Sequence, residues 1–205
     1  MSANPSPAYA EFIRHISAAR HTAGTASALS FQVTGALQVD DLLRGALVQG
    51  VSALDRYIHE EVRERLLQLF EHEAPPAAML KLQVPLSAVR KFREEGGTAW
   101  LDEVVRERHS YLSFQNPDKI ADAIRLISER ELWKEISEII GRPVRDLKQE
   151  LKLIVARRNS IAHEADISPV PPYEQNPIRF EDVVSTLNFV ERLVSAIHSI
   201  IKKDV

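Results

Sequence analysis

The stretch VDDLLRGALVQGVSALDRYIHEEVRERLLQLFEH, residues 39–72, is the longest periodic segment of the chain and decides its expected fold. Its apolar residues recur at intervals of three and four, which is the spacing of one helix face: Leu43, Leu47, Val51, Leu54, Ile58, Val62 and Leu69. Pro75 and Pro76 come soon afterwards, and proline cannot continue a helix. We therefore predict a long helix from Val39 to His72 that buries one apolar face.

Proline and glycine divide the rest of the chain into further helices. Asn116 is placed to cap a helix that has Pro117 as its first residue and ends at Gly141, and Pro143 can open the next helix. A last helix at 179–204 turns one apolar stripe inward: Phe180, Val183, Leu187, Val190, Val194, Ile197 and Ile201. The same signals predict helices at 8–23, 84–97 and 98–114, a linker with a short turn at 24–38, and a proline-rich loop at 167–177.

These segments indicate neither a strand hairpin nor an internal repeat. We therefore expect a single all-α domain over residues 1–205, a helical bundle with additional short helices. Residues 1–7 are expected to form a disordered tail.

The composition supports a helical globular chain and excludes several kinds of site. Of 205 residues, 44% are hydrophobic, 27% are charged and only 7 are glycine, which favours helices over sheets. The absence of cysteine excludes disulfides, thiolate metal ligands and thiol nucleophiles. With a net charge of -3, any contact with nucleic acid must depend on a local cluster. Neither a signal peptide nor a membrane span is indicated, so we expect a cytoplasmic protein without membrane contact.

One residue of the helix that follows Pro143 is out of place. In LKQELKLIVARRNSIAHEAD, residues 147–166, an apolar arc appears when residues are placed at about 100° intervals: Leu147, Leu151, Ile154, Val155, Ile161 and Ala162. Arg158 falls in the middle of this arc. Burying an unpaired guanidinium costs several kcal/mol. Arg158 therefore either pairs with a carboxylate, such as that of Asp55, or lines a seam that receives an anion. Arg157 lies on the flank of the arc.

A polar residue and a histidine follow the arginine pair on the same helix. Asn159 and His163 are neighbours at i and i+4, so the Asn159 amide could hydrogen-bond to the imidazole and fix its ring. Arg158 and His163 point in different directions and are about 7.5 Å apart along the axis, so one rigid helix does not easily bring both to one phosphate. A second copy of the helix across a twofold axis would do so. Alternatively, His163 only complements the helix dipole.

Two segments carry a resemblance to a known family. RNSIAH resembles the signature of HEPN domains, in which an arginine is followed by a polar residue and then by a histidine, and ARRNSIAHEAD is similar to its form in the RiboL-PSP-associated HEPN group. LVQGVSALDRYIHE resembles the early helix of that group, which has small residues before an element that is Asp55, Tyr57 and His59 in this chain.

The resemblance implies roles for individual residues. Arg158 and His163 would form the catalytic pair, Asn159 would be the polar residue, and Arg157, Asp55 and His59 would support the site. Asp55 and His59 would either orient each other or meet Arg158, and the simpler alternative is that Asp55 is only a buried partner of Arg158.

HEPN proteins are helical bundles that usually dimerise, and many are metal-independent endoribonucleases. The resemblance therefore implies an RNA substrate, a homodimer with a composite site, no cofactor or metal, and a role as a toxin or phage-defence effector with an antitoxin or defence-system partner. Histidine suits proton transfer near neutral pH and arginine suits phosphate, so cleavage by the 2′-hydroxyl is the expected chemistry. The alternative is a catalytically inactive HEPN module that dimerises or binds a partner protein, RNA or nucleotide.

Overall fold

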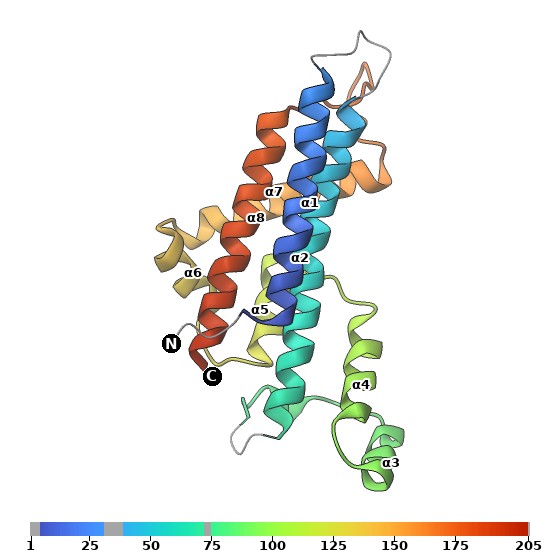
Figure 1. The fold of residues 1–205 in the computed structure, drawn as a ribbon, viewed down its shortest axis with the longest axis vertical. Helices are drawn as coiled ribbons and strands as arrows, with labels where there is room; N and C mark the ends of the chain where they lie inside the picture. The colour runs from blue at the N-terminus through green and yellow to red at the C-terminus, as the bar shows by residue number, and fades with distance from the viewer. Residues whose placement is uncertain (1–4, 31–38, 72–74, 205) are drawn as a thin grey trace.

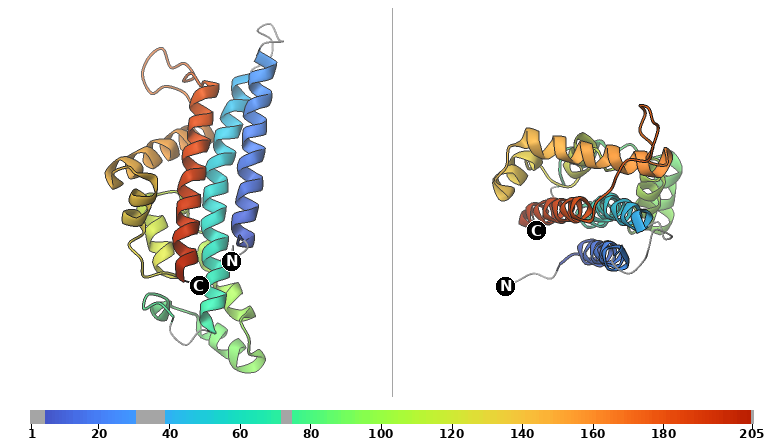
Figure 2. Two further views of the ribbon diagram at one scale, coloured as in Figure 1. Left: turned by 60° about the vertical axis from the view of Figure 1, so that its left-hand side comes forward. Right: turned by 90° about the horizontal axis from the view of Figure 1, so that it is seen from above.

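The computed structural model describes residues 5–30, 39–71 and 75–204. These residues form α-helices and short 3-10 helices without a strand, which confirms the all-α fold class. In chain order the elements are α1 (Pro7–Ser30), α2 (Val39–Phe70), η1 (Met79–Lys81), α3 (Leu86–Glu95), α4 (Ala99–His109), α5 (Pro117–Arg125), α6 (Leu132–Ile140), α7 (Val144–His163), α8 (Phe180–Ile201) and η2 (Lys202–Asp204). The long helices α1, α2 and α8 pack side by side, and α7 crosses α2 and α8 on the side opposite to α1 (Figures 1 and 2).

Helix α2 lies at the centre of this arrangement, because it contacts α1, α4, α5, α7 and α8. Its predicted apolar face is confirmed, since all seven residues predicted to form it, from Leu43 to Leu69, are buried. The predicted face of α8 is also confirmed: Phe180 is partly buried against the core and the other six residues are buried. The two helices approach closely at Gly50, where a Cβ atom would collide with the Leu187 side chain.

The N-terminal helix is longer than the sequence predicted. The expected linker is wrong for residues 24–30, because α1 continues to Ser30; residues 31–38 lie outside the described residues. Gly24 makes no turn within this helix, and a Cβ atom there would meet nothing within 4 Å. The expected tail is also too long: Ser6 donates a hydrogen bond to Glu61 at 2.5 Å, and Pro7 is the first residue of α1.

The single helix expected at 116–141 is wrong, because the chain breaks it into α5 and α6. Ile127 is buried in the break, and the side chains of Ser128 and Arg130 donate hydrogen bonds to the Asp204 carboxylate at 2.6 and 2.7 Å. These contacts join residues more than 70 positions apart, so no local pattern reveals them. The expected ends are confirmed: Asn116 caps α5 through its side chain, and Gly141 ends α6 in the left-handed conformation. Within the described residues, no helix has both the length and the hydropathy to cross a bilayer.

Candidate functional site

The arginine pair lies in the second half of α7, which is less deeply buried than the first half. The first half of α7 buries Leu147, Leu151 and Ile154, whereas no residue from Val155 to His163 is fully buried. Val155 and Ile161, on either side of the arginine pair, are partly buried and pack against the core, so the apolar arc is only partly covered there. Both arginines are half-buried, so the guanidinium of Arg158 is not sealed inside the protein.

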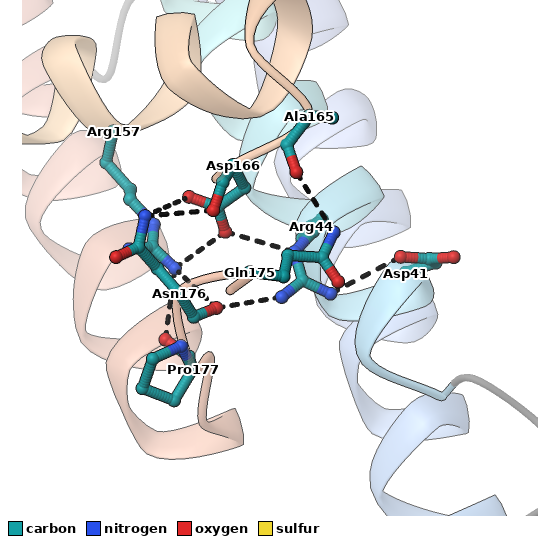
Figure 3. A network of polar contacts seen from close by, with 8 residues as sticks. All are labelled: Asp41, Arg44, Arg157, Ala165, Asp166, Gln175, Asn176 and Pro177. Carbon is teal, nitrogen blue, oxygen red and sulfur yellow. Dashed lines mark hydrogen bonds and ion pairs between the residues drawn. The ribbon is translucent and has the colours of Figure 1, made fainter. Parts of the chain in front are cut away.

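Arg157 is held by a buried carboxylate that the sequence analysis did not identify. Its Nη2 donates to Asp166 Oδ2 at 2.8 Å, and Arg44 Nε of α2 donates to the same oxygen at 3.0 Å (Figure 3). The side chain of Asp166 is 0% exposed and that of Arg44 is 7% exposed. A carboxylate in such surroundings needs compensating charge and hydrogen bonds, and the two guanidinium groups supply both.

The same network fixes the loop after α7. Arg44 and Arg157 both donate to the Asn176 carbonyl, at 2.8 and 3.3 Å, and Arg157 also donates to the Pro177 carbonyl at 3.0 Å. The Asn176 amide donates to Asp166, and Arg44 reaches a second carboxylate, that of Asp41, at 3.3 Å (Figure 3). The network joins α2, α7 and both ends of the loop, so Arg157 stabilises the structure around the candidate site.

A signal for this network was present in the sequence. Arg44 stands among the buried residues Leu43, Ala46 and Leu47 of α2, and the reasoning applied to Arg158 would have flagged it as an arginine within an apolar face. Its partner, Asp166, lies 122 positions away, so its identity required the structure.

Arg158 differs from Arg157 in having no carboxylate partner. Its Nη1 donates to the neutral amide oxygen of Asn159 at 3.0 Å, and its Nε is buried without a hydrogen-bond partner. Among the described residues, no carboxylate oxygen forms an ion pair with it. The alternative of an ion pair with Asp55 is therefore wrong, and the guanidinium keeps donors available for an anion.

The other two members of the predicted site are exposed near the end of α7. Asn159 and His163 lie on its outer face, and in the part of the chain that the structure describes the His163 side chain has neither a hydrogen bond nor an ion pair. The suggested hydrogen bond between them is not formed, because the Asn159 oxygen accepts from Arg158 instead. His163 is the last residue of α7, and the following turn bonds back to the Ser160 carbonyl through the backbone of Glu164 and Asp166.

Asp55 and His59 lie together elsewhere on α2. Asp55 Oδ1 accepts from the backbone N–H of Phe114 at 2.5 Å and lies 3.9 Å from His59 Nε2, so the two groups are close but not hydrogen-bonded. That they orient each other stays a prediction. The ring of His59 contacts those of Phe114 and His109, with centroid distances of 4.5 and 5.8 Å. Asp55 and His59 thus belong to a cluster between α2 and the region that follows α4.

The fold and the end of α7 together define a class of protein. An all-α bundle in which the penultimate α-helix ends in RRNSIAH has the features of a HEPN domain. The family model described as RiboL-PSP-HEPN matches residues 25–203, and the chain belongs to this family. Comparisons with curated proteins and with solved structures gave no match. Membership identifies the protein as a HEPN-type nuclease or binding module.

Proposed function

We propose that this protein is a metal-independent endoribonuclease that cleaves RNA through its own 2′-hydroxyl group. The observation that carries the proposal is the contrast between two adjacent arginines. Arg157 is paired through Nη2 with a buried carboxylate, whereas Arg158 donates through Nη1 to a neutral amide only, and its Nη2 has no partner among the described residues. A guanidinium in this state is suited to bind a phosphate, because its planar donors can contact two oxygens at once.

In the proposed reaction the 2′-oxygen attacks the adjacent phosphorus and the bond to the 5′-oxygen breaks. The His163 imidazole accepts the proton of the 2′-hydroxyl, and a second imidazole donates a proton to the leaving 5′-oxygen. Arg158 offsets the charge on the phosphate oxygens, and Asn159 orients its guanidinium. The products are a 2′,3′-cyclic phosphate and a 5′-hydroxyl, and DNA is not a substrate because it lacks the nucleophile.

The second imidazole is proposed to come from a second copy of the chain. The outer face of α7 presents one continuous exposed stripe that ends in the candidate site: Gln149, Lys152, Leu153, Ala156, Asn159 and His163. Leu153 is 60% exposed in the middle of this stripe. Pairing of two α7 stripes around a twofold axis would cover Leu153 and bring both copies of His163 to one composite site.

We propose a toxin or phage-defence effector as the biological setting, with an antitoxin or another defence component as its partner. Such a protein degrades the RNA of its own cell when released from control. The proposal expects induced expression to arrest growth and the Arg158→Ala variant to relieve the arrest.

The direct test is incubation of the purified protein with total RNA in EDTA. We expect cleavage by the wild type, a loss of about 100-fold or more in His163→Ala, and a comparable loss in Arg158→Ala. Arg145→Ala is the matched control, because Arg145 lies on the same helix, is 92% exposed and contacts only its neighbour Asp146. A substrate with a single deoxyribose at the cleaved position should resist cleavage there.

Two further measurements separate the parts of the proposal. Leu153→Asp should lower both the dimer fraction in sedimentation and the cleavage rate, while circular dichroism stays unchanged. RNA that stays intact at high concentrations of a folded, dimeric wild type would instead identify a catalytically inactive binding module.

A further inference from the structure

A polar hollow lies between α2 and α4, away from the arginine pair. It has a volume of about 400 Å³, which is within the range of small-molecule sites. The α2 side contributes Asp55 and His59, and the α4 side contributes His109. The Phe114 ring packs against both imidazoles, with centroid distances of 4.5 Å to His59 and 5.3 Å to His109.

Another hollow along α2 lies nearer to the end of α7. This other hollow, of about 530 Å³, is bordered by Ile161 and Ala165 from the end of α7 and by α2 residues as far as Val48 and Gln49. The hollow between α2 and α4 starts at Ser52. Val48 and Ser52 are i and i+4 neighbours, about 6 Å apart on the same helix face. An RNA strand that binds at the end of α7 can therefore continue along α2 into the hollow between α2 and α4.

A buried histidine gives this hollow an unused hydrogen-bonding group. His109 is 8% exposed, and its Nδ1 is buried without a partner. Burial, followed by the influence of His59 and Arg108, lowers the pKa of His109 to about 4. The imidazole is therefore neutral near pH 7, with one nitrogen as donor and the other as acceptor.

The charges around the hollow disfavour a phosphate group. Three arginines line it, and each is already engaged by carboxylates: Arg56 by Glu11, Arg63 by Glu60 and Asp102, and Arg106 by Asp102. Asp55 and Glu60 add negative charge. Among the described residues, Asp55 Oδ2 has no hydrogen-bond partner, so it can accept from an N–H group of a ligand. A neutral, planar heterocycle with an amino group fits this chemistry better than an anion does.

We propose that the hollow between α2 and α4 is a base-binding subsite, which holds a nucleobase of the bound RNA. This inference rests on the proposed ribonuclease function. His59 and His109 supply donors and acceptors to the edge of the base, and Asp55 accepts from its exocyclic amine. Adenine, guanine and cytosine carry that amine and uracil does not, so uracil is the disfavoured base.

Binding can be measured without any cleavage. The four ribonucleosides would be titrated into full-length His163→Ala protein, and the imidazole signals of His59 and His109 followed by nuclear magnetic resonance. We expect adenosine, guanosine or cytidine to shift both signals, with uridine binding several-fold more weakly. His59→Phe keeps a ring against Phe114 and should abolish the shift at His109, whereas His21→Phe, at an exposed position of α1, should leave it intact.

Cleavage maps provide the second readout. In wild-type digests one position near the cut should be depleted of uridine, and the fragments that His59→Phe produces should lack this bias. The inference is overturned if no ribonucleoside shifts either imidazole signal, or if His59→Phe keeps the same base bias. Nucleoside binding by a protein that never cleaves RNA would support the base pocket and refute the ribonuclease proposal, so the two failures are distinguishable.

Discussion

Replacing each of the two adjacent arginines of α7 by alanine should affect stability very differently. Arg157→Ala removes donors from the Asp166 carboxylate and from the Asn176 and Pro177 carbonyls. A hydrogen bond to a charged group contributes about 1.5–3 kcal/mol. The Arg157 side chain is 30% exposed and Asp166 keeps its contact with Arg44, so the lower part of this range applies.

We expect Arg157→Ala to lower the free energy of unfolding by about 2 kcal/mol, which corresponds to a fall of about 4–8 °C in Tm for a chain of this size. Arg158→Ala removes one contact with the exposed amide of Asn159, and should cost less than about 0.5 kcal/mol. Urea unfolding followed by circular dichroism measures both values, with Arg145→Ala as the unchanged control. If Arg158→Ala proved as destabilising as Arg157→Ala, Arg158 would be a structural residue and its availability for phosphate would be refuted.

Three further predictions concern the fold. Gly50→Ala should cost about 1–3 kcal/mol in urea unfolding, because the added methyl group displaces Leu187; unchanged stability would contradict this close approach. Asn116→Ala should cost about 1 kcal/mol through loss of the α5 cap, while Asn116→Asp should cost much less. His109 has a pKa near 4, so the unfolded chain takes up its proton first and stability should fall as the pH drops from about 6.5 toward 4; His109→Phe should flatten this part of the pH profile.

The sequence predicted those parts of the fold in which local periodicity and burial agree. The faces of α2 and α8 have strict helical spacing, and both are buried as expected. The break between α5 and α6 was missed because helical spacing continues through Ile127, while the contacts that stop the helix come from Asp204 at the far end of the chain. Gly24 led to the opposite error, a linker predicted where α1 continues, because an isolated glycine can lie inside a helix that is stabilised by its packing.

The candidate site was predicted only in part for a related reason. Helical geometry placed Arg158 on the apolar arc, but it could not show that this arc is only partly buried from Val155 onward. The ion pair with Asp55 failed because Asp55 instead accepts from the backbone of Phe114. Arg157 was predicted to support the site; the structure shows its ion pair with Asp166 beside Arg44, and its role in the site stays a prediction.

The bonds between Asp166 and Asn176 have a consequence for engineering. They include the backbone N–H of Asn176 donating to the Asp166 carbonyl at 2.8 Å, and they close the base of the segment 167–175. Val170 and Tyr173, each 62% exposed, project from that closed base. A peptide tag or fluorescent reporter can therefore replace residues 169–173 while the ends of α7 and α8 keep their spacing, which gives a labelling position beside the proposed catalytic histidine.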